Sequence, residues 1–339
     1  DQRRATVKQA EIYSKITDAE RLKMINKVLL SASKDYWEWY FSFYNYLLIE
    51  ESLSISETIY NMVRQDFEFG EAAAIDTVRA ATSYQQRQVD RRNALIDFKR
   101  AGLILSNYIW SDEESPLVLQ DDMVPQLNLI SNLLTTDIPL DSLVTMALQR
   151  HPELVKTSLK LDQLDIDRRL AKENLKPTLD LNYNLINSPI NSQGDFVDVQ
   201  IRNNYKFGVN FGIPLFLRKE RAKLRQTQIK IQQTGYHLSL QEREIVNDIQ
   251  ASYFELDNTQ DMLVLMNESV DFYKRIFELE ILNLELGESD LFKINFQQDK
   301  LLEAQIKLMK MRADMEKARV GLYWSAGLPY LNFNQDSAN

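Results

Sequence analysis

The chain has 339 residues, and its 40 basic and 49 acidic residues give a formal net charge of −9 at pH 7. This balance disfavours nucleic acid as a partner, because binding to phosphates needs a basic face. No stretch of 18 or more apolar residues occurs, which excludes a transmembrane helix, and the chain contains no cysteine from which a redox compartment could be inferred.

The first predicted element is a long helical hairpin in residues 1–110. No proline occurs before Pro116, so this region can be helical throughout. Apolar residues recur every seven positions in two rows, Leu48, Ile55, Met62, Phe69 and Tyr46, Leu53, Tyr60, Phe67. A seven-residue period is typical of coiled coils. Because the rows lie about 200° apart around the helix, we expect an apolar neighbour on each side, as in a cylinder of helices.

The stretch FEFGE at residues 67–71 predicts the end of this helix. A helix C-terminus commonly needs a residue with positive φ, which Gly70 supplies without steric cost. The path from Arg3 to Gly70 corresponds to about 100 Å at about 1.5 Å per residue. A second helix is predicted to return from Asp76 to Tyr108, so Gly70 marks a hairpin tip.

An aromatic cluster lies about halfway along the first helix. It consists of Tyr36, Trp37, Trp39, Tyr40, Phe41, Phe43, Tyr44 and Tyr46. An aromatic ligand site is one interpretation, but aromatic residues at helical spacing usually form core. We therefore predict packing between neighbouring helices.

Residues 111–176 are predicted to lead from this hairpin to a different kind of structure. Residues 111–139 contain three prolines and several acids, which indicates a connector with short helical pieces. Residues 140–176 are predicted to be helical up to Pro177, with a break or kink at Pro152.

In residues 177–217 the apolar period changes to two, which predicts a pair of strands. The apolar positions expected on one face are Leu179, Leu181, Tyr183, Phe207, Val209 and Phe211. Such segments suit either a soluble amphipathic hairpin or membrane strands. Both strands are fused directly to helices at prolines, at Pro177 and Pro214.

Residues 218–328 repeat the first hairpin at an ungapped offset of 217 positions. LELGE at residues 284–288 matches FEFGE, and the return helix is predicted from Leu291 to Trp324. The apolar rows recur as Leu265, Phe272, Leu279, Leu286 and Leu263, Val270, Phe277, Leu284. Residues 329–339 are a C-terminal tail. The counterpart of the strand pair would precede Asp1, so a first helix, two strands and any signal peptide are expected upstream.

The order of helix, proline, two amphipathic strands, proline, long helix, glycine tip and return helix resembles the TolC family of bacterial outer-membrane efflux proteins. Three stretches carry the resemblance: FEFGEAAAIDTVRAATSY, ALQRHPELVKTSLKLDQLDIDRRLAKENLKPTLDLNYN and FGIPLFLRKERAKLRQTQI. Together with the repeat, the resemblance covers essentially the whole chain.

This resemblance implies a mainly α fold with a membrane β-barrel portion and two pseudo-symmetric halves. Three protomers would close a twelve-stranded barrel in the outer membrane, and long antiparallel coiled-coil hairpins would form an α-barrel across the periplasm. The resemblance further implies a passive exit duct for efflux or type I secretion. Its expected partners are a periplasmic adaptor protein, an inner-membrane transporter and outer-membrane lipid.

The resemblance also implies roles for individual residues. The hairpin tips would dock the adaptor, through Glu68, Gly70, Glu71, Glu285, Gly287 and Glu288. Family members often narrow the periplasmic mouth with acids six and nine positions after the second glycine, where this chain has Lys293 and Phe296. Asp76, Asp290 and Lys293 are the candidate constriction residues here, and the acidic aperture of the family is not carried over.

The sequence offers no constellation for catalysis, cofactor binding or metal binding. It has no phosphate loop, nucleophile elbow or HExxH motif. Its only histidines, His151 and His237, are far apart. A soluble coiled-coil interaction or adaptor protein, with residues 177–216 as a surface hairpin, is the alternative interpretation. The transported substrate and the class of pump stay open.

Overall fold

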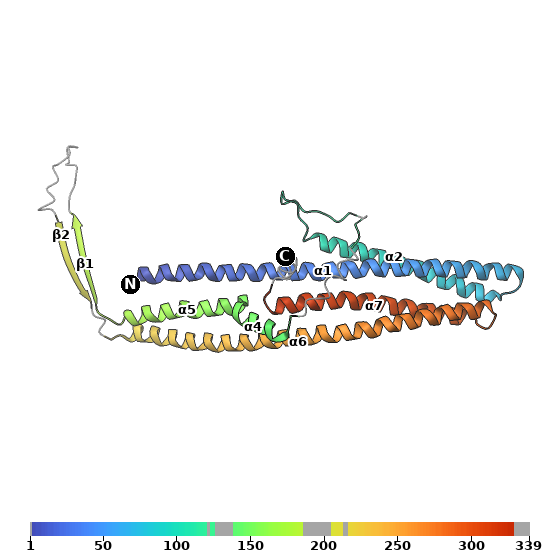
Figure 1. Cartoon of the computed structure of the whole chain (residues 1–339). Coiled ribbons are helices and arrows are strands. Elements are labelled where there is room, and N and C mark those ends of the chain that lie inside the picture. The colour runs from blue at the N-terminus through green and yellow to red at the C-terminus, as the bar shows by residue number, and fades with distance from the viewer. Residues whose placement is uncertain (1, 121–122, 126–137, 186–204, 213–215, 329–339) are drawn as a thin grey trace, which may run out of the picture. The chain divides into compact units, whose positions relative to one another are not determined.

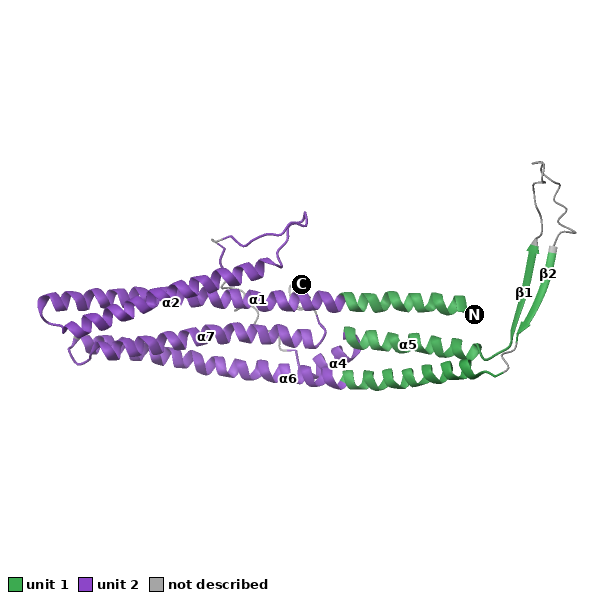
Figure 2. Cartoon of the chain, turned by 180° about the vertical axis from the view of Figure 1, so that it is seen from behind, with its two compact units in different colours: residues 1–21, 152–242 green, residues 22–151, 243–339 purple. Residues whose placement is uncertain are grey.

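The computed structural model describes residues 2–120, 123–125, 138–185, 205–212 and 216–328. The chain forms two compact units, residues 1–21 with 152–242 (unit 1) and residues 22–151 with 243–339 (unit 2; Figure 2). The elements follow each other in the order shown in Figure 1: α1 (Gln2–Phe69), α2 (Ala74–Ser106), α4 (Leu140–Arg150), α5 (Pro152–Glu173), β1 (Thr178–Leu185), β2 (Tyr205–Gly212), α6 (Arg218–Glu285) and α7 (Leu291–Ser325).

The two long helices have equal length. α1 and α6 each contain 68 residues, and the helices that follow them, α2 and α7, contain 33 and 35. Equal lengths are what an ungapped internal repeat predicts. The sequence therefore predicted the two helical hairpins correctly.

The predicted break at Pro152 is confirmed. α4 ends at Arg150, and His151 adopts an extended conformation with φ −60° and ψ 126°. The residue before a proline is driven out of the helical region by a clash with the proline ring. Pro152 itself then begins α5, a position where its missing N–H costs nothing.

The connector after α2 is irregular where it is described. Residues 111–120 and 123–125 contain no helix, so the predicted short helical pieces are not found there. Trp110 instead forms an isolated β-bridge with Pro116. Residues 121–122, 126–137 and the predicted tail 329–339 lie outside the described residues.

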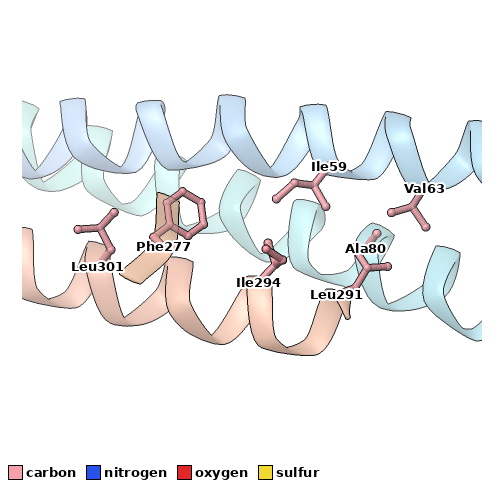
Figure 3. Packing of buried hydrophobic residues seen from close by; sticks show 7 residues of the cluster. All are labelled: Ile59, Val63, Ala80, Phe277, Leu291, Ile294 and Leu301. Atoms are coloured by element: carbon pink, nitrogen blue, oxygen red, sulfur yellow. The ribbon is translucent and has the colours of Figure 1, made fainter. Parts of the chain in front are cut away.

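One apolar core joins the two hairpins of unit 2 next to their turns (Figure 3). All four helices contribute to it, with Ile59, Val63, Ala80, Phe277, Leu291, Ile294 and Leu301. Val270 and Leu284 of α6 pack against this cluster as well. One of the two predicted apolar rows of α6 therefore faces the core of the chain.

The aromatic cluster of α1 forms core, as predicted. Trp37, Trp39 and Tyr40 are only 4%, 5% and 1% exposed. Tyr40 packs in a cluster with Ala313 of α7, while Trp39 packs against α2 with its ring centroid 6.2 Å from that of Phe98. The aromatic residues thus join α1 to both return helices.

A buried polar contact fixes the register of α7 against α1. The Gln298 amide donates to the Ser52 carbonyl at 2.9 Å and to the Ser56 hydroxyl at 3.1 Å. All three residues are buried. A buried amide must be hydrogen-bonded to avoid a desolvation penalty, so this pairing favours one alignment of the two helices.

In unit 1, helix α5 packs against the first residues of both long helices through polar contacts. Gln9 of α1 donates to Asp167 at 2.6 Å, and Thr157 donates to Gln241 of α6 at 2.7 Å. Lys156 forms an ion pair with Glu20 at 2.7 Å. These contacts define the antiparallel register of α5 with each neighbour.

β1 and β2 form an antiparallel hairpin within unit 1. Apolar residues are paired directly across it, as Leu179 with Phe211, Leu181 with Val209 and Tyr183 with Phe207. Side chains of paired residues lie on the same face of a sheet. The period-two pattern therefore gives one apolar and one polar face, as predicted.

Across the described residues, no helix combines the length and the apolar composition that crossing a membrane requires.

Candidate functional site

The first hairpin tip is a glycine-terminated helix end. Gly70 has φ +81°. Its N–H donates to the Phe67 carbonyl at 3.0 Å, and the Glu71 N–H donates to the Asp66 carbonyl at 2.8 Å. These two bonds define a Schellman motif, which satisfies carbonyls that the end of a helix leaves without partners.

The second tip repeats this geometry at the offset of the sequence repeat. Gly287 has φ +75°. Its N–H donates to Leu284 at 3.0 Å, and the Glu288 N–H donates to Asn283 at 2.8 Å. The recurrence of FEFGE and LELGE therefore reflects one backbone motif used twice.

The return helices begin differently after the two tips. Asp290 caps α7, because its side chain accepts a 3.0 Å hydrogen bond from the Lys293 N–H. Ala73 precedes α2 and offers no side-chain cap. Asp76 lies in the first turn of α2 and pairs with Arg79 at 3.4 Å. The three candidate constriction residues, Asp76, Asp290 and Lys293, therefore all lie where the return helices begin.

The structure brings the two predicted docking tips to the same end of unit 2 (Figure 1). The core cluster beside the turns contains Val63 and Ala80 of the first hairpin and Leu291 of the second. The predicted docking residues exposed there are Glu68, Gly70, Glu71, Gly287 and Glu288. Glu285 is the last residue of α6, and its side chain lies outside the described part.

Each tip also exposes apolar side chains, which reasoning from the sequence missed in part. Phe69 and Ile75 are 80% and 55% exposed at the first tip, and Leu286 and Phe292 are 66% and 68% exposed at the second. Phe69 and Leu286 were assigned only to helix seams. Ile75 and Phe292 could have been found, because the 217-residue register pairs them at the same place in the two tips.

The apolar face of the strand pair is uncovered. Its six predicted residues, Leu179, Leu181, Tyr183, Phe207, Val209 and Phe211, are all between 54% and 66% exposed. A contiguous exposed apolar face marks a surface for another protein or for a membrane.

Two seven-residue apolar rows in unit 2 are uncovered as well. The α6 stripe, Leu265, Phe272, Leu279 and Leu286, is between 60% and 66% exposed. The α2 stripe, Ile75, Val89, Ile96 and Leu103, is between 51% and 61% exposed and is interrupted by Thr82 at the position between Ile75 and Val89. Among the described residues, neither stripe is covered by another part of the chain.

One carboxyl group of unit 2 is buried with an unusual pKa. Glu316 of α7 is fully buried and forms an ion pair with Arg319 at 3.1 Å. Burial raises the pKa of Glu316 from 4.5 to about 7, and the positive charge of Arg319 only partly offsets this effect. Among the described residues, no group of three or more His, Asp or Glu side chains is arranged to hold a metal ion.

Comparison with known proteins identifies related sequences and folds. A model of the outer membrane efflux protein family matches residues 143–328. No curated protein matches the chain by sequence.

Three solved structures share the fold. The CmeC outer membrane channel of Campylobacter jejuni is 15% identical with a TM-score of 0.76, covering 99% of this chain and 71% of that one. The open state of the MtrE outer membrane channel of Neisseria gonorrhoeae is 15% identical with a TM-score of 0.75, covering 96% and 72%. The outer membrane protein VceC of Vibrio cholerae is 11% identical with a TM-score of 0.75, covering 96% and 76%.

We predict that Gly287→Ala loosens the second tip through backbone strain alone. No atom lies within 4 Å of a Cβ placed on Gly287, so the cost is that of positive φ, about 1–2 kcal/mol. Hydrogen exchange at the Glu288 amide should therefore accelerate by about 5- to 30-fold. Gly287→Asn, which tolerates positive φ better, should accelerate it less. Equal effects of the two substitutions would contradict this account.

We predict that Glu316 makes stability fall as pH rises from about 4.5 to about 7. Across this window the folded protein retains a proton that the unfolded chain has released. The loss is on the order of 3 kcal/mol, at about 1.4 kcal/mol per pKa unit. Thermal unfolding should show a smaller pH dependence for Glu316→Gln than for the unmodified protein. The same pH dependence in both proteins would contradict the assignment of this loss of stability to Glu316.

Proposed function

Because the chain belongs to the outer membrane efflux protein family and lies in the bacterial outer membrane with a periplasmic part, we propose that three copies form a channel-tunnel for passive export. The family match confirms the resemblance noted in the sequence. The proposal of a closed assembly rests on the two uncovered stripes of unit 2.

The stripes lie on different helices and follow the seven-residue period of helix seams, with one polar position, Thr82, in the α2 stripe. The α2 stripe of one copy would pack against the α6 stripe of the next, a head-to-tail contact that closes into a ring. Burying one Leu, Ile or Phe side chain contributes about 1.5–3 kcal/mol. Four such residues on each side therefore supply a strong driving force for association.

The strand pair would supply the membrane portion of the assembly. Backbone groups in lipid must be hydrogen-bonded, so strands cross a bilayer only as part of a closed barrel. The apolar residues from Leu179 to Phe211 would face lipid, and Asp180, Asn182 and Asn210 would face the polar interior. The membrane β-barrel expected from the sequence would form in this way.

The hairpin tips would dock a periplasmic adaptor protein and, through it, an inner-membrane transporter that supplies the energy. Both tips combine exposed glutamates with an exposed apolar pair. Buried aromatic and aliphatic anchors within a polar rim are typical of protein interfaces. Asp76, Asp290 and Lys293 would narrow the mouth beside these tips with charges of both signs.

We predict that Leu279→Lys prevents assembly. A lysine in the α6 stripe places a charge in the seam between copies, where its desolvation opposes association. Protein extracted in mild detergent should shift from trimer to monomer in native mass measurements. Glu278→Lys is the matched control, because Glu278 is exposed next to the stripe but outside it. If the Leu279→Lys protein remains trimeric to the same extent as the Glu278→Lys control, the α6 stripe does not form this seam.

We predict that Phe292 anchors the adaptor. A photo-crosslinking residue in place of Glu288 should form an adduct with a periplasmic adaptor in cells, identified by mass spectrometry. Phe292→Ser should reduce that adduct by about tenfold or more, since it removes an apolar anchor, and should leave the trimer intact. The same crosslinker at Glu268, which is exposed away from the tip, serves as the control. An adduct that is unaffected by Phe292→Ser would refute the anchor.

A further inference from the structure

One end of unit 1 carries a concentration of positive charge to which three segments distant in sequence contribute. Residues 2–5, 172–176 and 216–225 contain nine basic residues and only two acidic ones, Glu173 and Glu220. The nine, which we call the basic collar, are all exposed: Arg3, Arg4, Lys172, Lys176, Arg218, Lys219, Arg221, Lys223 and Arg225. The whole chain, in contrast, has a net charge of −9.

The register of the helices places these residues at the same level. Gln9 contacts Asp167, so Arg3 of α1 lies level with Glu173, the last residue of α5, in this antiparallel pair. Thr157 of α5 contacts Gln241 of α6. Glu173 follows Thr157 by as many residues as Arg225 precedes Gln241, so Arg225 is level with Glu173 in this antiparallel pair as well. The collar is therefore assembled from three helix ends that are distant in sequence.

Helix ends and ion pairing also contribute to the electrostatics of the collar. The N-terminus of α6 lies there and carries a partial positive charge, which the partial negative charge at the C-terminus of α5 offsets only in part beside nine basic side chains. One of the two acids, Glu173, is already paired with Lys176 at 2.7 Å. The acids are thus too few to neutralise the collar.

The collar adjoins the apolar face of the strand pair through the covalent chain. Lys176 is separated from β1 only by Pro177. Phe216, between β2 and α6, is 77% exposed, and the Arg218 guanidinium lies 5.7 Å from the centre of its ring. Exposed aromatic and basic side chains beside an apolar face are typical of a boundary between membrane and water.

We propose that the basic collar binds the phosphates of anionic phospholipids in the periplasmic leaflet of the outer membrane. This inference rests on the proposed insertion of β1 and β2 in that membrane. With the strands in the hydrocarbon layer, Lys176 and Arg218 reach headgroup level within a few residues of chain. Basic residues within about 10 Å of an anionic surface, the Debye length at 0.1 M salt, are attracted to it. The collar thereby fixes the depth at which the helices leave the bilayer.

The test measures lipid selectivity in the full-length protein purified in mild detergent. The probe is fluorescent phosphatidylglycerol, compared with phosphatidylcholine that carries the same label and acyl chains. We expect tighter binding of phosphatidylglycerol. The triple variant Lys219→Gln, Lys223→Gln and Arg225→Gln should lower this preference by about fivefold per residue, on the order of 100-fold in total. The preference of the unmodified protein should also weaken in 1 M salt.

Two matched variants separate the role of the collar from general effects of charge or folding. Replacing the exposed Lys274, Lys307 and Lys310 by Gln makes the same change of charge in unit 2 and should leave the preference unchanged. Replacing Lys219 and Lys223 by Arg retains the charge of the collar and should retain the preference. Equal losses in the collar and control triples would overturn the inference.

Cell fractionation distinguishes failure of this inference from failure of the proposed insertion. A full-length protein that does not fractionate with the outer membrane would contradict strand insertion itself. A protein that fractionates there but shows no preference for phosphatidylglycerol would overturn the collar alone. Binding to isolated peptidoglycan that is lost in the collar triple, with lipid selectivity unchanged, would assign the collar to the cell wall and overturn the lipid proposal.

Discussion

The seven-residue spacing of apolar side chains on the long helices is the constraint on which the rest of the structure depends. α6 carries two such rows on opposite sides, and only the row that contains Phe277 meets the core of the chain. The other row, which contains Leu279, has no cover within the described residues. A helix built in this way buries both rows only between two neighbours, and the described part of the chain provides one of them. The same repeat that forms the hairpins thus also provides the apolar row on which the proposed assembly rests.

The internal repeat solves the problem of aligning such long helices. Both hairpins turn through the same Schellman motif at Gly70 and Gly287, so both return helices start from equivalent positions. The first turns then differ in chemistry, with a side-chain cap at Asp290 and an ion pair at Asp76. The backbone of the two copies is held equivalent, while the charge at each tip varies independently.

Local patterns were sufficient to predict the helices, the glycine tips, the break at Pro152 and the strand pair, because each depends on residues adjacent in sequence. The irregular connector was missed, since acids and prolines do not distinguish loop from short helix. The exposure of Ile75 and Phe292 and the burial of Glu316 depend on which helix faces which, and the basic collar depends on three distant segments. Such features require the register between helices, which no single segment encodes.

The buried contact of Gln298 with Ser52 and Ser56 restricts how the helices of unit 2 can move. Sliding α7 along α1 by one turn, about 5.4 Å, would keep at most one of the two serines beside the amide and break its other hydrogen bonds, at about 1 kcal/mol for each bond lost. Apolar contacts on both sides of Gln298, of Ile59 with Ile294 and of Tyr40 with Ala313, join the same two helices. The pair therefore resists axial shear, so a displacement at the tips would move α1 and α7 together.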